Sequence, residues 1–244
     1  MVGTRGADTY LSDVRSSLLR ALAVVLMTAG SLIALPMPAA IADPCPDVEL
    51  IFARGSAEPP GVGGVGQAFV DAVQAKAVGK SVAVYPVTYE ASVDFGDTMA
   101  FALTVIDGIR DASNRIQSQA AACPNTRIVL GGFSQGAAVA GFTTAAQVPA
   151  GVPAFMVPAP MPPEVAKHVA AVALFGKPSN QFLADAGAPL ITIGPLYVPK
   201  TIDLCAPGDT ICNGAPPGPP NAAHGAYPVD GLVQQAADFV VGHL

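Results

Sequence analysis

A serine flanked by glycines stands at position 134, within the segment LGGFSQGAAVAG of residues 130–141. The apolar run Ile128-Val129-Leu130 before it is typical of a buried strand, and the run 137–140 after it is typical of a buried helix. Gly132-Phe133-Ser134-Gln135-Gly136 is a G-x-S-x-G element, which at a strand-to-helix turn lifts the serine hydroxyl clear of the sheet. The sequence therefore predicts Ser134 as a nucleophile, and the alternative is a serine that only serves the turn.

A serine hydroxyl attacks only when a neighbouring base takes its proton, and the chain offers three histidines. His243 is the penultimate residue, where chain ends fray, and His168 lies on a short predicted helix. His224 lies in a Pro- and Gly-rich segment after the last predicted strand. A loop there would hold the imidazole above the carboxyl edge of a parallel sheet, so His224 is the predicted base.

A carboxylate must lie between the serine and the histidine if the chain follows the order Ser, acid, His of α/β-hydrolases. The four carboxylates in this interval are Glu164, Asp185, Asp203 and Asp209. Asp209 stands between Cys205 and Cys212, in a loop that a local disulfide would stiffen, which suits a residue that orients an imidazole. Asp209 is the first candidate and Asp203 the second. Turn chemistry alone also explains an aspartate after Pro-Gly.

All four cysteines, Cys45, Cys123, Cys205 and Cys212, follow an apolar leader, and an even number in an exported chain implies disulfides. Three pairings exist. The short separation of the last two cysteines favours a local bridge, which would leave the first two to pair, each standing just before a predicted strand. The sequence alone leaves the other pairings open. A metal site would call for C-x-x-C or paired histidines beside the cysteines, so neither a metal nor a cofactor is predicted.

The first 42 residues have the order of a secretory signal. Three arginines precede the apolar run Ala21–Leu35, and the small residues Ala40-Ile41-Ala42 follow it. The pattern predicts a signal peptide over 1–42, cleavage after Ala42, and a secreted protein that is extracellular or associated with the cell envelope. An uncleaved anchor is the alternative, but the apolar run is shorter than the about 20 residues of a membrane span.

The composition excludes two classes of protein. The 244 residues carry a net charge of −6, and only 12% of them are charged. A nucleic-acid-binding protein needs a basic face, and a disordered chain is poorer in apolar residues.

Strand-like and helix-like runs alternate along the chain. The predicted strands are Val48–Ala53, Val82–Tyr85, Arg127–Phe133, Ala171–Phe175 and Leu190–Ile193. The predicted helices are Gln67–Ala77, Asp97–Ala121, Gln135–Ala146, Pro163–Val169 and Val229–Val241. The strands are almost continuously apolar, which indicates burial on both faces. The pattern predicts a single domain over 43–244, a three-layer α/β/α sandwich with a mostly parallel sheet of about five strands.

A glycine-rich run, Gly61–Gly66, also fits the dinucleotide-binding pattern G-x-G-x-x-G. Pro59-Pro60 separates it from the preceding strand, and export of the chain disfavours a soluble nicotinamide cofactor. An oxidoreductase is therefore kept only as a formal alternative.

Five segments, taken together and in this order, resemble the cutinase family of serine esterases. They are FARGSAE at 52–58, GGFSQGAAV at 131–139, ALFG at 173–176, CAPGDTIC at 205–212 and AHGAY at 223–227. The resemblance covers essentially all of the chain after the leader. It implies a small α/β-hydrolase with Ser134, Asp209 and His224 as its triad, and the absence of a long insertion predicts a site without a large lid. It also supports the bridges Cys45–Cys123 and Cys205–Cys212.

The resemblance further implies an oxyanion hole. Its donors would be the backbone N–H of Gln135 and the N–H and hydroxyl of Ser56, which must face the oxygen that becomes negative during the reaction. The alternative for Ser56 is a plain turn residue.

The implied activity is hydrolysis of carboxylic esters through an acyl-enzyme, with short- to medium-chain acyl esters, lipids or cutin-like polyesters as substrates. Acyl transfer or thioester hydrolysis by the same triad is the first alternative, and a secreted non-catalytic scaffold is the second. The expected partners are an ester or lipid substrate and, transiently, a lipid or cell-envelope surface. Nucleic acid is not an expected partner, and the sequence does not indicate an oligomeric state.

Overall fold

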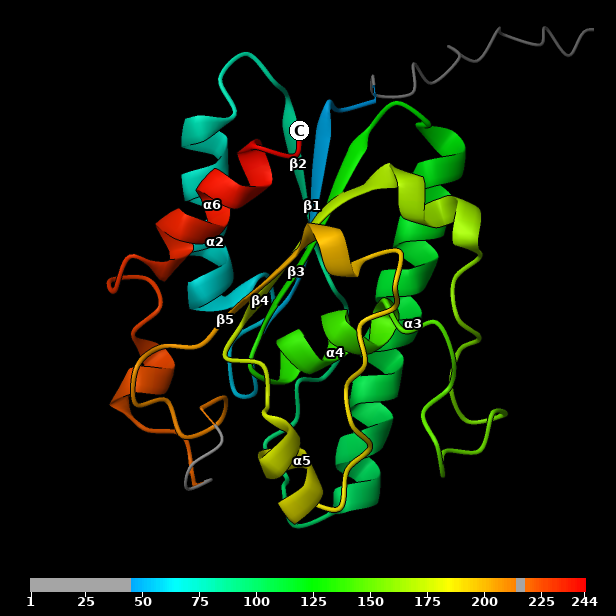
Figure 1. The fold of residues 1–244 in the computed structure, drawn as a ribbon, viewed down its shortest axis with the longest axis vertical. Helices are drawn as coiled ribbons and strands as arrows, with labels where there is room; N and C mark the ends of the chain where they lie inside the picture. The colour runs from blue at the N-terminus through cyan, green and yellow to red at the C-terminus, as the bar shows by residue number, and fades with distance from the viewer. Residues whose placement is uncertain (1–44, 214–217) are drawn as a thin grey trace, which may run out of the picture. The chain divides into compact units, whose positions relative to one another are not determined.

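Five parallel strands form one sheet in the computed structural model, which describes residues 45–213 and 218–244. They are β1 (Val48–Ala53), β2 (Val82–Pro86), β3 (Arg127–Phe133), β4 (Val169–Phe175) and β5 (Thr201–Leu204). Their order is β2-β1-β3-β4-β5, and every neighbouring pair is parallel. All carboxyl ends therefore meet at one edge, at the bottom in Figure 1. The predicted signal peptide and its cleavage point lie outside the described residues.

Helices cover both faces of the sheet (Figure 1). One face carries α2 (Gly63–Lys76) and α6 (Leu232–Val241), and the other carries α3 (Thr98–Ala122) and α4 (Gln135–Thr143). The short helix α5 (Asn180–Asp185) follows β4. The predicted three-layer α/β arrangement is thus confirmed. Within the described ranges, no helix combines the length and hydropathy that crossing a membrane requires.

The core has two halves, one on each face of the sheet. On the side of α2 and α6, the rings of Phe52, Phe69 and Phe175 pack together with centroids between 5.3 and 6.3 Å apart. On the side of α3 and α4, Ile51 and Leu130 are among the fully buried aliphatic side chains. Successive residues of a strand point to opposite faces, so β1 buries Phe52 on one side and Ile51 on the other. This explains why the strands are apolar without alternation.

The last predicted strand, Leu190–Ile193, is wrong, because the fifth strand is Thr201–Leu204. Ile191 packs against Ala138 of α4 and Leu183 of α5 instead of entering the sheet. The N–H of Gly194 donates to the carbonyl of Thr144, outside any strand ladder. The apolar run was therefore a signal of burial against helices. The edge strand β5 was harder to detect because its middle residues are partly exposed.

Several element ends also differ from the predictions. Helix α2 begins at Gly63, inside the glycine-rich run, and α4 ends at Thr143. Helix α6 begins at Leu232, and the short predicted helix is a 3-10 turn, Pro163–His168, that leads directly into β4.

Two disulfides join Cys45 to Cys123 and Cys205 to Cys212, and no cysteine in the described part of the chain is free. The first bridge ties the residues just before β1 to the end of α3, at the amino edge of the sheet. The second closes a short loop after β5, at the carboxyl edge. The pairs are the ones that the sequence favoured.

Burial of the tyrosines gives a testable property of the fold. The pKa of each described tyrosine is raised, chiefly by burial, and that of Tyr197 reaches about 12; the four are Tyr85, Tyr89, Tyr197 and Tyr227. Burial of a neutral phenol adds to the free energy of unfolding, and this contribution is complete below the pKa of about 10 that the phenol has in the unfolded chain. The contribution is lost as the pH rises through the higher pKa of the folded chain. We expect tyrosinate absorbance to develop at higher pH in native protein than in guanidinium-unfolded protein. The chain contains no tryptophan to obscure the band. Coincident titration curves would contradict this account.

Candidate active site

Ser134 occupies a sharp turn between the carboxyl end of β3 and the first residue of α4. Its backbone has φ 54° and ψ −117°, a conformation that a residue with a side chain rarely adopts. The turn is held in place by the N–H of Ser134, which donates to the carbonyl of Phe175 at 2.9 Å. Strain of this kind persists only when the surroundings enforce it, and it concentrates at functional sites.

The two glycines of the G-x-S-x-G element are required by close packing. A Cβ atom at Gly132 would collide with the backbone oxygen of Gly136, and one at Gly136 would collide with the carbonyl of Ala53 at the end of β1. Only glycine lets β3, the turn and α4 approach β1 this closely. The spacing of the motif therefore follows from the turn that presents Ser134.

His224 links the serine to a carboxylate. It lies in the 3-10 turn Ala222–Gly225, where the backbone N–H of His224 donates a hydrogen bond to the side chain of Asn221. Its Nε2 lies 2.8 Å from Ser134 Oγ, and its Nδ1 lies 2.9 and 3.0 Å from the two carboxylate oxygens of Asp209. His224 is 5% exposed and Asp209 is fully buried. The structure thus brings Ser134, His224 and Asp209 into one hydrogen-bonded chain.

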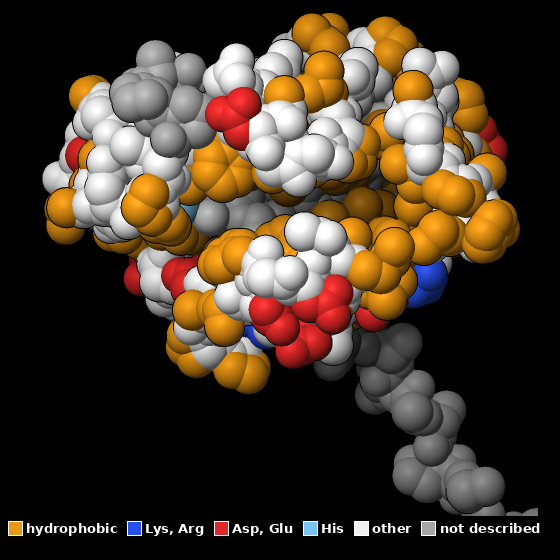
Figure 2. All heavy atoms as spheres, turned by 90° about the horizontal axis from the view of Figure 1, so that it is seen from below, with side chains coloured by type: hydrophobic (Ala, Val, Ile, Leu, Met, Phe, Trp, Pro, Cys, Tyr) orange, Lys and Arg blue, Asp and Glu red, His pale blue; other side chains and the backbone are white. Residues whose placement is uncertain are grey.

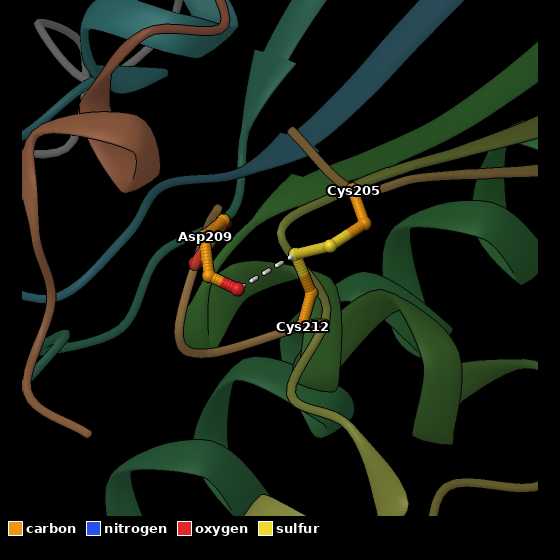
Figure 3. A group of neighbouring side chains, drawn as sticks. All are labelled: Cys205, Asp209 and Cys212. Atoms are coloured by element: carbon orange, nitrogen blue, oxygen red, sulfur yellow. Dashed lines mark hydrogen bonds between the residues drawn. A yellow bond between two sulfur atoms is a disulfide. The ribbon is translucent and has the colours of Figure 1, made fainter. Parts of the chain in front are cut away.

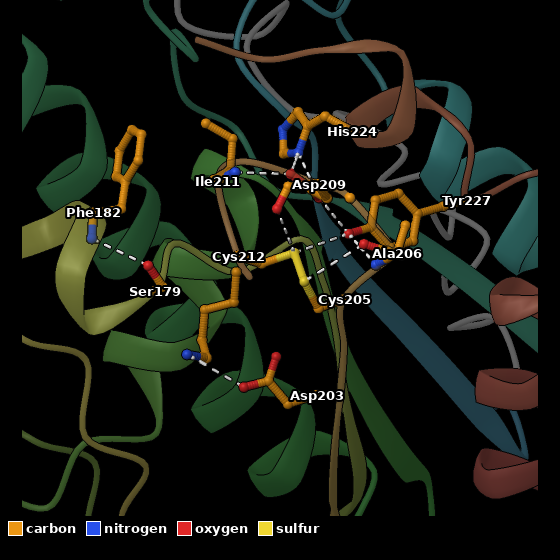
Figure 4. Close-up of a disulfide and its surroundings, with 12 residues drawn as sticks. Ser179, Phe182, Asp203, Cys205, Ala206, Asp209, Ile211, Cys212, His224 and Tyr227 are labelled. Carbon is orange, nitrogen blue, oxygen red and sulfur yellow. Dashed lines mark hydrogen bonds and ion pairs between the residues drawn. A yellow bond between two sulfur atoms is a disulfide. The ribbon is translucent and has the colours of Figure 1, made fainter. Parts of the chain in front are cut away.

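Asp209 is fixed by the loop that the second disulfide closes (Figure 4). Its Oδ1 accepts from the backbone N–H of Ile211 at 2.9 Å, and its Oδ2 accepts from the hydroxyl of Tyr227 at 2.6 Å. Together with His224, these donors surround both carboxylate oxygens. A buried carboxylate needs such partners, because an unpaired charge in a protein interior is very costly.

The other carboxylate candidates do not reach His224. Asp203 lies in β5, is 47% exposed and forms an ion pair with Lys177 at 3.2 Å. Asp185 accepts a hydrogen bond from Gln181 on the exposed side of α5. Glu164 lies in the 3-10 turn before β4, at the opposite edge of the sheet.

The other two histidines also lie away from Ser134. His168 ends the 3-10 turn before β4, where its Nδ1 contacts the carbonyl of Pro124. His243 follows α6, and its Nδ1 contacts the carbonyl of Phe239 within that helix.

The residues proposed for the oxyanion hole lie side by side. Ser56 follows β1, and Gln135 is the first residue of α4, so its N–H has no acceptor within the helix. The Ser56 hydroxyl donates to Gln135 Oε1 at 3.2 Å, and Gln135 Nε2 donates to the hydroxyl of Thr104 at 3.3 Å. The Ser56 loop and the start of α4 both stand at the carboxyl edge of the sheet, beside Ser134.

The loop that carries Ser56 is held by two charged residues. The Arg54 guanidinium donates to the carbonyls of Tyr89 and Glu90 at 2.7 and 2.8 Å. The Glu58 carboxylate accepts from the N–H groups of Gly55 and Gly64, both at 2.6 Å. Glu58 thus occupies the amino end of α2, where a dinucleotide-binding protein holds its pyrophosphate. The glycine-rich run forms the entry into α2 and its first turn, whose N–H of Gly64 is already bonded to Glu58, and this disfavours the oxidoreductase alternative.

Two positions that the sequence analysis did not single out complete the site. One is Tyr227, the donor to Asp209. The other is Gly176, which has φ +57°, and a Cβ atom there would lie 3.0 Å from His224 Cε1 and 3.0 Å from the Tyr227 hydroxyl. Their signal was present in the sequence, since they end the segments AHGAY and ALFG.

A group of metal-ligand atom types also occurs here, as Figure 3 shows. Cys205, Asp209 and Cys212 bring their ligand atoms within 4.8 Å of one another. Both sulfurs are consumed by the disulfide, so neither can become the thiolate that metals bind. The Asp209 carboxylate is already surrounded by hydrogen-bond donors. The cluster is therefore interpreted as structural.

Seen from the carboxyl edge of the sheet, the surface has a groove bordered mainly by hydrophobic side chains (Figure 2). The segment between β2 and α3 has the exposed apolar residues Val93 and Phe95, and Met99 in the first turn of α3 is exposed as well. This segment adjoins the Ser56 loop, because the N–H of Ala57 donates to the carbonyl of Ala91 at 3.3 Å. Apolar surface at this edge of the sheet is suited to the hydrocarbon part of a substrate.

Comparison with known proteins identifies the family of this chain. The model of the Cutinase family matches residues 44–244. A probable carboxylesterase, Culp7 of Mycobacterium tuberculosis, is 60% identical over 165 residues, which are 68% of this chain and 86% of that protein. Carboxylesterase Culp1 of Mycobacterium bovis is 46% identical over 232 residues, 93% of this chain and 96% of that protein.

Solved structures show the same fold. A cutinase of Trichoderma reesei in complex with a phosphonate inhibitor matches with a TM-score of 0.60 and 29% identity, over 82% of this chain and 77% of that one. A cutinase-like protein from Cryptococcus matches with a TM-score of 0.62 and 26% identity, over 83% of this chain and 97% of that one. The chain described here therefore belongs to the cutinase family of carboxylic ester hydrolases.

Proposed function

We propose that this chain is a secreted serine esterase in which Ser134 is the nucleophile, His224 the general base and Asp209 the residue that orients the imidazole. The observation that carries the proposal is the continuous hydrogen-bonded chain from Asp209 through His224 to Ser134, with contacts of 2.8 to 3.0 Å. An alcohol in this arrangement loses its proton to the imidazole as it attacks.

The reaction has two stages. Ser134 Oγ attacks the ester carbonyl carbon while its proton moves to His224 Nε2, and the buried carboxylate stabilises the resulting imidazolium. The oxygen that becomes negative is held by the N–H of Gln135 and by Ser56. His224 then returns the proton to the departing alcohol, which leaves an acyl group on Ser134. Water, activated by the same imidazole, releases the acid and restores the serine.

The groove supports an ester with an apolar acyl chain. We propose short- to medium-chain carboxylic esters, including lipid esters or cutin-like polyesters, as the substrates. The relatives include both carboxylesterases and a phospholipase, Culp4 of Mycobacterium tuberculosis, 44% identical over 200 residues that are 82% of this chain and 80% of that protein. Acyl transfer to another alcohol, or hydrolysis of thioesters, uses the same residues and is the second candidate, since the triad does not determine the acceptor.

Secretion is supported by two independent features. The leader has the order of a cleavable signal peptide. All four cysteines form disulfides, which persist in oxidising compartments. We propose an extracellular or cell-envelope location, where lipid surfaces supply the substrate.

Covalent labelling tests the nucleophile directly. An alkyl phosphonate ester should react with the folded protein, and peptide mapping should find a single adduct on the peptide that contains Ser134. The guanidinium-unfolded protein is the control, and it should not react because the serine is activated only by the folded site. A folded protein that remains unlabelled, or that is labelled elsewhere, contradicts the proposal. A panel of esters graded by acyl length and by headgroup, with thioesters and acceptor alcohols included, then defines the substrate class.

A further inference from the structure

Tyr227 forms a directed hydrogen bond to the acidic member of the site. Its hydroxyl donates to Asp209 Oδ2 at 2.6 Å and accepts from the backbone N–H of Ala206 at 3.1 Å. A phenol has a single proton, and the Ala206 N–H approaches the oxygen rather than the proton. The proton of Tyr227 is therefore directed to the carboxylate. Figure 4 shows the side chains of Tyr227 and Asp209 next to each other.

The Tyr227 ring cannot easily move away from this position. The residue is fully buried, and the ring packs edge-on against Phe133 and Phe175, with centroids 5.7 and 6.0 Å away. Phe133 in turn lies over the His224 imidazole, with ring centroids 4.9 Å apart. The hydroxyl also contacts Cys212 Sγ at 3.4 Å, so the disulfide packs against it.

The hydroxyl also remains protonated wherever the enzyme is expected to work. Burial, followed by the hydrogen bond to Asp209, raises the pKa of Tyr227 far above that of a free tyrosine. Tyr227 is thus a constant donor near neutral pH rather than a titrating group of the reaction.

We infer that Tyr227 is a positioning residue that holds the Asp209 carboxylate in place and limits how strongly this carboxylate attracts the proton of the His224 imidazolium. The inference rests on the proposed function. The carboxylate divides its charge among three donors: Ile211 N–H, Tyr227 O–H and His224 Nδ1–H. Without the Tyr227 donor, more of the carboxylate's negative charge acts on the imidazole, and the Oδ2 atom of Asp209 is free to shift.

The test is Tyr227→Phe, which removes one oxygen atom and keeps the ring. We expect kcat for a soluble ester to fall about 10- to 100-fold, the worth of one hydrogen bond to a charged group. KM should be unchanged, because the buried hydroxyl does not face the groove. The acid limb of the pH–rate profile should move to higher pH, because an imidazolium next to a less shared carboxylate keeps its proton longer.

The charged groups on the surrounding elements remain unchanged in this variant. They are Glu58 in the Ser56 loop, the ion pair between Lys177, which follows β4, and Asp203 of β5, and Asp230, which follows the turn that carries His224. A displaced acid limb is therefore attributable to the missing hydroxyl.

Tyr197→Phe is the matched control. Tyr197 is also a buried tyrosine, but it lies just before the amino end of β5, at the opposite edge of the sheet. It should keep the wild-type kcat and the wild-type acid limb. A displaced limb in both variants would overturn the inference.

Replacing Tyr227 with 3-fluorotyrosine provides a second arm that keeps the ring and the hydroxyl, and it decides the question if the phenylalanine variant fails to fold. The fluorinated phenol is a stronger donor, so the acid limb should move in the opposite direction, to lower pH. Activities are expressed per phosphonate-reactive serine. The inference would be overturned if the acid limbs of the Tyr227 variants coincided with that of the wild type. It would also be overturned if the loss of kcat disappeared once activity is expressed per phosphonate-reactive serine. Failure of the proposed function would look different, because the wild-type serine itself would not be labelled.

Discussion

Replacing Ser134 with alanine should lower kcat for ester hydrolysis by about 10⁵- to 10⁶-fold. In the proposed mechanism the hydroxyl oxygen of Ser134 forms the acyl-enzyme, and without it no side chain remains for His224 to activate. Residual turnover should reflect only substrate binding and the oxyanion donors acting on water. Single-turnover and steady-state measurements with the same ester would establish the loss.

The fold of this variant should be intact. Ser134 has a positive φ, but serine already carries a Cβ atom in this conformation, so its replacement by alanine adds no atom that could collide. Ser118→Ala, an exposed position on α3, is the matched control and should retain full activity. Undiminished turnover by Ser134→Ala, with both disulfides present and an unchanged melting temperature, would end the proposed mechanism.

Replacing Asp209 with asparagine should lower kcat by about 10⁴-fold while the loop keeps its shape. The carboxylate holds the imidazole in the tautomer whose Nε2 accepts the serine proton, and it stabilises the imidazolium that forms. An amide carries no charge and offers a single oxygen to Ile211, Tyr227 and His224 together. The rate should be measured per phosphonate-reactive serine, so that misfolded protein does not contribute to the loss.

Asp203→Asn is the control for this substitution. Asp203 is 47% exposed and pairs with Lys177 rather than with the imidazole. Its replacement should change kcat less than about twofold, since exposed ion pairs contribute little. Equal losses in the two variants would mean that the structure assigns the acid incorrectly.

Much of the fold follows from local patterns in the sequence. Strands β1 and β3 are continuous apolar runs because the sheet is covered on both faces, and this signal gave their bounds correctly. The same reasoning misassigned Leu190–Ile193. An apolar run indicates that a segment is buried, but it does not indicate whether the segment is buried within a sheet or against helices.

In the site, too, some features follow from local sequence and others do not. Gly132 and Gly136 are readable from sequence because the collisions they avoid are imposed by one local turn. Pattern alone only ranked Asp209 before Asp203, and the resemblance to the cutinase family favoured Asp209. Asp203 lies in β5 and Asp209 in the loop after it, and they differ in whether the side chain turns toward solvent or toward His224. That direction is set by the path of the loop after β5.

Sequence patterns were enough to predict the turn that carries Ser134, the order in which Ser134, Asp209 and His224 follow one another, the favoured disulfide pairs and the alternation of strands and helices. These depend on residues that are neighbours along the chain or on a resemblance of whole segments. The packing of distant segments placed Asp209, and not Asp203, against the imidazole and brought the Tyr227 hydroxyl within hydrogen-bond distance of Asp209. The reason is physical. Hydrogen-bond partners in a buried site come from loops far apart in sequence, and their meeting depends on how the sheet and its covering helices pack.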